Sequence, residues 1–154
     1  MTRFMLVVGT TQTAAIEGIS AAGVTRDAMR YTPAADAELL YYGRPTRAPM
    51  VPVSPTGCPT PALVTRTVQE LVGFDPLIVE AGLAEPTGAP TLSVGTAPGR
   101  DIREGEAVLD ASGVVERVRE HGRALPDTEL VVGESIPGVT TTPLGLLTAL
   151  GLPD

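Results

Sequence analysis

Short apolar runs recur along the chain, and polar residues, glycine and proline separate them. Aliphatic and β-branched residues dominate these runs, as is usual for strands. Several runs are apolar on both faces, Leu77-Ile78-Val79 among them, which is typical of strands that helices cover on both sides of a parallel sheet. The pattern predicts an α/β fold with strands over residues 4–8, 38–42, 76–79, 91–94 and 129–132.

Three segments between and after these runs carry helix signals. The first begins at Thr60-Pro61 and ends at Gly73, with apolar residues at helical spacing between them. The second covers residues 104–124, where apolar positions lie opposite charged ones, so we expect one face to pack on the sheet. The third runs from Thr142-Pro143 to Gly151. Two loops rich in proline and glycine, residues 44–61 and 85–103, are functional segments, surface crossovers or docking segments.

Composition narrows the class of protein. With 154 residues and 43% apolar residues, the chain makes one globular domain over residues 1–154. Acidic residues outnumber basic ones by 18 to 11 and Trp is absent, so the chain repels phosphate backbones and lacks base-stacking platforms. We therefore expect no nucleic-acid partner. The single cysteine, Cys58, excludes an internal disulfide and a multi-cysteine zinc site, and we predict no metal.

The first apolar run is too short for a signal peptide or a membrane span. We therefore expect a cytoplasmic protein without a membrane partner. Every basic residue is arginine apart from the single histidine. Because lysine is absent, Schiff-base catalysis and a P-loop lysine are excluded, and anions must be bound by arginine, hydroxyls or backbone amides.

The segment with the clearest chemical pattern is residues 128–145, TELVVGESIPGVTTTPLG. A buried strand is followed by a glycine-containing loop with three consecutive threonines and then by a helix start. Backbone N–H groups at a helix N-terminus favour anions, and ligands bind beyond the carboxyl ends of parallel strands. The segment predicts either a phosphate site or an ordinary turn whose threonines cap the helix.

Charged residues near other strand ends are secondary candidates. Glu80 directly follows a predicted buried strand, as Glu134 does, and a charge there is costly unless it is paired or used. Arg26, Asp27 and Arg30 lie in a polar segment, residues 23–43, which also contains Asp36 and Glu38 and could recognise an anion or form ion pairs at an interface. The alternatives are a structural ion pair for Glu80, a solvated loop carboxylate for Glu134 and a solvated turn with local salt bridges for the three residues of the polar segment.

Several of these segments resemble a known family, the archaeal and cyanobacterial proteins similar to nicotinate-nucleotide–dimethylbenzimidazole phosphoribosyltransferase of cobalamin biosynthesis. Five pieces in the same order carry the resemblance: GVTRDAMRYTPAADAELLYYG (23–43), PTGCPTPALVTR (55–66), VEAGLAEP (79–86), GRDIREGEAV (99–108) and VVGESIPGVTTTPLG (131–145). Together they cover most of the chain after residue 20.

The resemblance implies a Rossmann-like, mainly parallel sheet with helices on both faces. It also implies transfer of phosphoribose from nicotinate mononucleotide to a benzimidazole-type base, without a further cofactor. Carboxylates would stabilise positive charge at the anomeric carbon, and a general base would take the proton of the incoming base. The loop GESIPGVTTT is similar to a nucleotide-binding loop of the family and marks phosphoribose-site candidates: Gly133, Glu134, Gly138, Thr140, Thr141 and Thr142.

Members of that family are longer chains, and the resemblance stops within their first half. The family's general base lies in the later part, so no residue here matches it. We therefore expect an incomplete half of a larger domain that functions with a complementing C-terminal chain or as a homo-oligomer. Two other expectations stay open: a non-catalytic module that binds a nucleotide, and an inactive fragment.

Overall fold

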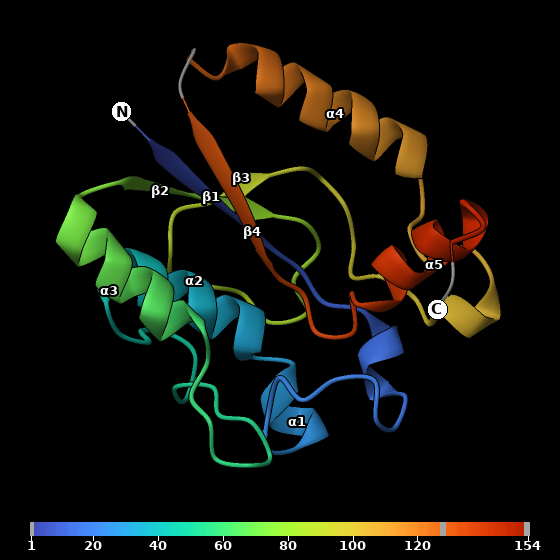
Figure 1. The fold of residues 1–154 in the computed structure, drawn as a ribbon, viewed down its shortest axis with the longest axis horizontal. Helices are drawn as coiled ribbons and strands as arrows, with labels where there is room; N and C mark the ends of the chain where they lie inside the picture. Colours follow the sequence, from blue (N-terminus) through green and yellow to red (C-terminus); the bar gives the residue numbers. More distant parts are fainter. Residues whose placement is uncertain (1, 127–128, 153–154) are drawn as a thin grey trace.

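The computed structural model describes residues 2–126 and 129–152 and has an α/β architecture (Figure 1). Four strands form one sheet in the order β3-β2-β1-β4, and every pairing is parallel. The strands are β1 (Arg3–Val8), β2 (Asp75–Glu80), β3 (Leu92–Ser93) and β4 (Leu130–Ser135). The predicted α/β class and Rossmann-like parallel sheet are confirmed.

The described residues also form five helices and two 3-10 helices, which lie between the strands except for the last, which follows β4. The helices are α1 (Arg26–Met29), α2 (Thr32–Tyr42), α3 (Ala62–Val72), α4 (Ala111–Ala124) and α5 (Thr141–Ala149), and the 3-10 helices are η1 (Gln12–Ala15) and η2 (Ile102–Glu104). In the described residues, 2–126 and 129–152, no helix is long and apolar enough to cross a membrane.

The strand register brings three strand ends together. Val8, the last residue of β1, pairs with Glu80 of β2 on one side and with Ser135 of β4 on the other. The loops that follow these residues therefore start at the same edge of the sheet. In parallel α/β sheets this carboxyl edge is where ligands bind.

The expected strand over residues 38–42 is wrong, because these residues end helix α2. Pro33 lies in the first turn, and Gly43 ends the helix with a left-handed backbone (φ 74°) and an N–H that donates to the Leu39 carbonyl. Nine of the eleven residues of α2 are buried. A helix that is buried all round has no apolar stripe, so its C-terminal apolar run cannot be told from a strand by periodicity.

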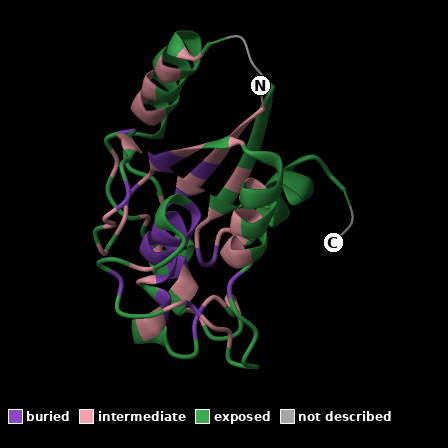
Figure 2. Ribbon diagram, turned by 90° about the vertical axis from the view of Figure 1, so that its left-hand side faces the viewer, coloured by how far each residue is buried: buried purple, intermediate pink, exposed green. Residues whose placement is uncertain are grey.

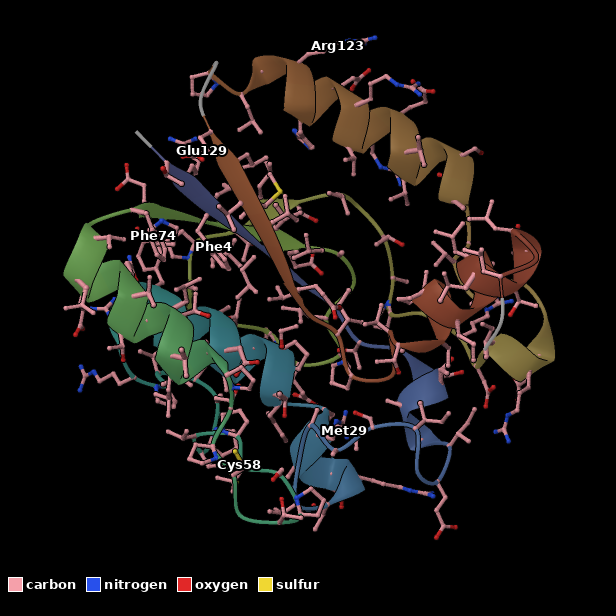
Figure 3. The ribbon with its side chains drawn as sticks, viewed as in Figure 1. Phe4, Met29, Cys58, Phe74, Arg123 and Glu129 are labelled. Carbon is pink, nitrogen blue, oxygen red and sulfur yellow. The ribbon has the colours of Figure 1, made fainter. Side chains whose placement is uncertain are left out.

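The hydrophobic core lies between α2 and strands β1 and β2. Leu6, Val8, Leu40 and Ile78 are buried in one cluster. The rings of Phe4 and Phe74 extend it at a centroid distance of 5.4 Å, and Figure 3 shows them side by side next to the sheet. Figure 2 shows the buried residues concentrated in α2 and the central strands.

Helices lie on both faces of the sheet, as predicted, but their apolar side chains are more exposed than expected. Helix α2 lies against one face and α4 on the opposite side (Figures 1 and 2). Helix α4 begins at residue 111 rather than 104, after Asp110, whose side chain accepts the Gly113 N–H. Its Val115 and Val118 are about half exposed, so the expectation that this apolar face packs on the sheet is wrong. The guanidinium of Arg117 instead joins the helix to the Val94 and Gly95 carbonyls.

Helix α3 packs mainly on α2. Its C-terminal half is open, with Leu71 79% and Val72 69% exposed. Strand β4, expected to be buried, is an edge strand in the described part of the chain, where it pairs only with β1. Its Val132 is accordingly 60% exposed.

Candidate functional site

A cavity of about 540 Å³ lies beside the carboxyl edge of the sheet, on the side that α2 covers. This volume is within the usual range for small-molecule sites, about 300–1,000 Å³. Its wall is formed by residues 4 and 6 of β1, residues 32, 36 and 40 of α2, residues 62 and 65 of α3, residues 133–140 of β4 and the following loop, and parts of loops 19–22 and 52–61.

Four of the six predicted phosphoribose residues line this cavity. Gly133 and Glu134 belong to β4, and Gly138 and Thr140 to the loop before α5. Thr141 and Thr142 are the first two residues of α5 and are not part of the cavity wall. The structure therefore brings together most of the predicted loop, but not its last two threonines.

The start of α5 has few amides to offer to an anion. The Thr142 N–H donates to the Val139 carbonyl at 2.7 Å, and the Val139 N–H donates to the Ile136 carbonyl at 3.0 Å. The Thr141 hydroxyl also donates a hydrogen bond within the turn, to the Gly138 carbonyl. Pro143 has no N–H. The N–H groups of Val139 and Thr142 and the hydroxyl of Thr141 are therefore used in hydrogen bonds within the turn.

Close packing explains why both residues are glycine at the positions that line the cavity, Gly133 and Gly138. A Cβ at Gly133 would lie 2.8 Å from Cζ of Phe4, so the ring crosses directly over the strand there. Gly138 has a φ of +85°, and a Cβ there would lie 2.9 Å from the Ala14 backbone nitrogen. Glycine is required at both positions by the fold, whatever the cavity binds.

The most distinctive group in the cavity is Asp36 of α2, a residue that is only 5% exposed. The Thr60 hydroxyl donates to its Oδ1 at 2.8 Å, and the Ser135 hydroxyl donates to its Oδ2 at 2.6 Å. Three segments that are far apart in the sequence therefore meet at one carboxyl group. Burial raises the pKa of Asp36 from 3.8 to about 6, although both hydroxyl hydrogen bonds lower it.

Sequence reasoning placed Asp36 in a polar segment and did not single it out as a site residue. Its signal is a carboxylate in the run Pro33-Ala34-Ala35-Asp36-Ala37, where the neighbours are apolar. On a buried helix, such a carboxylate must be neutralised or hydrogen-bonded. Its hydroxyl partners could not have been found this way, because Thr60 and Ser135 are distant in sequence.

Glu38, two residues further along α2, is fully buried but does not line the cavity. Its carboxylate accepts backbone N–H groups from Thr46, Arg47, Ala48 and Gly88. Burial alone would raise the pKa of Glu38, but these four backbone hydrogen bonds outweigh it and lower the pKa below its ordinary value. Glu38 holds the loop after α2 in place.

Glu134 borders the cavity from β4. Successive positions on a strand point to opposite faces of the sheet, so the Cα–Cβ bond of Glu134 points to the face opposite to that of Ser135. Burial raises the pKa of Glu134 above its ordinary value. The partial desolvation makes this carboxylate easier to protonate than a fully solvated one.

The secondary candidates lie outside the cavity wall. Glu80 accepts the N–H groups of Gly82 and Leu83 and the hydroxyl of Ser93, so it orders the loop after β2. Arg30 forms an ion pair with Glu85 at 2.6 Å. Arg26 and Asp27 are exposed on α1.

Arginine and histidine are missing from the cavity wall within the described residues, whereas two acidic residues, Asp36 and Glu134, belong to it. Cys58 also lines it, from an exposed position in the loop before α3 (Figure 3). In residues 2–126 and 129–152, no three His, Cys, Asp or Glu side chains are grouped to hold a metal ion. The cavity is therefore acidic and largely apolar.

The fold and site define an α/β protein with a small-molecule cavity at the carboxyl edge of a parallel sheet. The chain is similar to proteins named UPF0284, and no family model matches it. A UPF0284 protein of Halobacterium salinarum is 59% identical over 152 residues, which cover 99% of this chain and 46% of the relative. Relatives from Pyrococcus furiosus and Archaeoglobus fulgidus are each 42% identical, over 96% and 97% of this chain.

The chain spans just under half the length of these relatives, 45–46% in each case. Their names state neither a reaction nor a ligand. The similarity therefore relates the chain to one part of longer proteins.

Proposed function

We propose that this chain forms the nucleotide-binding part of a phosphoribosyltransferase. The reaction moves phosphoribose from nicotinate mononucleotide to a benzimidazole-type base, as in cobalamin lower-ligand assembly. The observation that carries the proposal is the cavity itself, in which the end of β4 and the following loop, residues 133–140, share a wall with the buried carboxyl group of Asp36. A glycine-containing loop and a titratable group share one site at the carboxyl edge of the sheet, where α/β enzymes bind nucleotides.

The chemistry of the wall supports this type of reaction. Loss of nicotinate from the sugar leaves positive charge at the anomeric carbon, and nearby carboxylates stabilise such charge in the transition state. Asp36 supplies a carboxyl group to the cavity, and Glu134 lies at its border on β4. Thr140 adds a neutral hydroxyl donor at the edge, next to the start of α5.

The proposed activity is that of a longer protein, because this chain covers less than half of the length of its relatives. Phosphate needs positive or N–H donors, and the cavity wall in the described residues has no arginine. We place the remaining phosphate contacts in the second half, supplied by a complementing chain or a second copy. Such a nucleotide-using enzyme acts in the cytoplasm.

A second candidate function is nucleotide binding without turnover. The lack of a residue that matches the family's general base favours it, because turnover needs the proton of the incoming base to be removed. The two candidates predict the same ligand and differ only in whether nicotinate is released.

A thermal-shift titration of the protein with nicotinate mononucleotide tests the proposal, with nicotinate and inorganic phosphate as separate controls. Binding to the native state raises the melting temperature in a saturable way. We expect the double variant Thr140→Ala with Glu134→Gln to lose the shift. The matched control is Thr148→Ala, which changes a threonine on α5 that bonds only within its helix.

Absence of any shift in the folded wild-type protein would refute the proposed function. A shift without nicotinate release, after a benzimidazole-type base is added together with the second half of the protein, would select the non-catalytic candidate.

A further inference from the structure

The open side of strand β4 carries backbone groups that point away from the sheet. Within the described residues, β4 pairs only with β1, on one side (Figure 1). The Ser135 carbonyl accepts the Gly9 N–H on that side. Hydrogen-bonding directions alternate along a strand, so the N–H and C=O groups of Leu130, Val132 and Glu134 point to the open side. Such an edge is a template for pairing with another strand.

Both faces of β4 are apolar and open. Ser135 bonds to Asp36 of α2, so Val131, two positions earlier, lies on the α2 face of the sheet, and Val132 lies on the opposite face. Val131 is 47% exposed and Val132 is 60% exposed. Edge strands are normally protected by charge, by proline or by short length, and Leu130-Val131-Val132 has no charge and no proline. A strand that is apolar on both faces is typical of the interior of a parallel sheet.

Helix α5, which follows β4, has the same character. It contains no charged residue, and its leucines are exposed, with Leu144 at 49%, Leu146 at 61% and Leu147 at 40%. These leucines occupy more than one side of the helix, because residues two apart on a helix do not share a face. A helix that is apolar on all sides is normally buried. Strand β4 and helix α5 therefore form one uncovered apolar surface, residues 130–132 and 144–147.

The length of the relatives indicates what covers this surface. More than half of the length of each relative lies outside the part that this chain matches. That additional chain is large enough to supply further strands and helices. Because all pairings in the present sheet are parallel, and purely parallel sheets are over-represented in proteins, a parallel strand is the expected neighbour of β4.

A second copy of this chain fits the surface less well. A two-fold axis perpendicular to the sheet would pair β4 with its own copy in the antiparallel direction, against the direction of the other strands. Each copy also carries a net charge of −7, so two copies repel each other.

We infer that the open edge of β4 pairs with a parallel β-strand from the part of the longer relatives that this chain does not span. The same part covers the apolar residues of α5. This inference concerns assembly and goes beyond the proposed function, because it requires neither the nucleotide nor the reaction.

Hydrogen exchange of single amides, followed by NMR, tests the strand pairing. The isolated chain is compared with a hybrid in which this chain takes the place of the 152 matched residues of the Halobacterium salinarum relative. We expect the amides of Leu130, Val132 and Glu134 to exchange at least about tenfold more slowly in the hybrid, because they become hydrogen-bonded. The alternate amides of β4, which face β1, are protected in both proteins. Equal exchange rates of the outer amides in the two proteins would overturn the inference.

A matched pair of variants tests the surface itself. Val132→Asp places a charge where the hybrid buries an apolar side chain, so we expect the Leu130 and Glu134 amides to exchange within about threefold of their rates in the isolated chain. The control is Val115→Asp, because Val115 is 53% exposed on α4, the helix that Arg117 links to the carbonyls after β3. The control should keep full protection. Equal protection in both variants would contradict the inference, and the wild-type comparison stays decisive if Val132→Asp does not fold.

Light scattering after size-exclusion chromatography tests the competing occupant. We expect the isolated chain to be a monomer. A dimer that Val132→Asp abolishes would assign the edge to a second copy and overturn the inference.

The outcome is separable from that of the proposed function. Protection of the outer β4 amides without any thermal shift by nicotinate mononucleotide supports the assembly and refutes only the proposed reaction. A shift with the mononucleotide without protection of these amides does the reverse.

Discussion

Asp36 and Glu38 are buried acidic residues on the same helix, but their surroundings differ. Four backbone N–H groups surround Glu38, and its pKa is lowered. Two side-chain hydroxyls hold Asp36 at the wall of a cavity, and its pKa is raised to about 6. The difference teaches that burial alone does not define a functional carboxylate. The number and type of donors decide whether the group is fixed as an anion or stays able to exchange a proton.

The largest effect is expected from loss of the Glu38 carboxylate. Glu38→Ala leaves four backbone N–H groups without their acceptor, so we expect the free energy of unfolding to fall by about 3 kcal/mol or more. Urea denaturation measures this change. The control Glu70→Ala removes a solvent-exposed partner of Arg66 and is expected to cost less than about 1 kcal/mol. Similar losses in both variants would contradict a structural role for Glu38.

Asp36 should make stability depend on pH in the opposite direction from Glu38. Its pKa rises from 3.8 to about 6 on folding, so the folded state holds the proton more tightly. The stability from this group is therefore complete below its ordinary pKa and is lost as the pH rises through about 6. Glu38, with a lowered pKa, contributes stability above its ordinary pKa and loses it as the pH falls through the lowered value.

We expect the wild-type protein to lose about 2–3 kcal/mol relative to Asp36→Asn between pH 4 and pH 7. Urea denaturation at each pH unit gives both curves. Asp27→Asn should follow the wild-type curve throughout. Parallel curves for wild type and Asp36→Asn would show that Asp36 has an ordinary pKa.

A smaller effect is expected at the glycine that shapes the cavity loop. Gly138→Ala places a Cβ at a positive φ and close to the Ala14 backbone, so we expect a loss of about 1–3 kcal/mol. Gly145, inside α5, has no atom within 4 Å of a Cβ, and Gly145→Ala should gain about 0.5–1 kcal/mol. Thermal denaturation measures both changes. A gain in stability in Gly138→Ala would contradict the close approach of the loop to Ala14.

The smallest effect is a shift in titration rather than in stability. The Ser135 hydroxyl bond lowers the pKa of Asp36, so Ser135→Ala should raise that pKa by about one unit or less. Carbon-13 NMR of the carboxyl groups follows the titration directly. Ser93→Ala removes a similar hydroxyl from Glu80 and should leave Asp36 unchanged. A fall in the pKa in Ser135→Ala would contradict the geometry at Asp36.

Much of the fold could be predicted from the sequence, because strands and helix boundaries have local signals. The apolar runs at 4–8 and 76–79 and the Gly73 helix end appear as predicted. Helix α2 was predicted in part as a strand because complete burial removes its periodicity. The exposure of β4 could not be predicted, because an apolar run does not reveal whether its strand lies at the centre or edge of a sheet.

The sequence predicted where the candidate site lies better than it predicted which residues form it. The glycine and threonine pattern after β4 identified a loop that lines the cavity. Its glycines are explained by contacts with Phe4 and Ala14, which no local pattern contains. The Asp36 cluster needs α2, the loop before α3 and the end of β4 to meet, so only the tertiary structure reveals it.

The most direct test of the account is carbon-13 NMR titration of the assigned Asp36 and Glu38 carboxyl groups in the wild-type protein. The account predicts that Asp36 titrates near pH 6, because burial disfavours its charged form. Glu38 should titrate below its ordinary pKa, because four backbone N–H groups stabilise its charged form. Titration of Asp36 at the same pH as Glu38, or at a lower pH, would contradict the account.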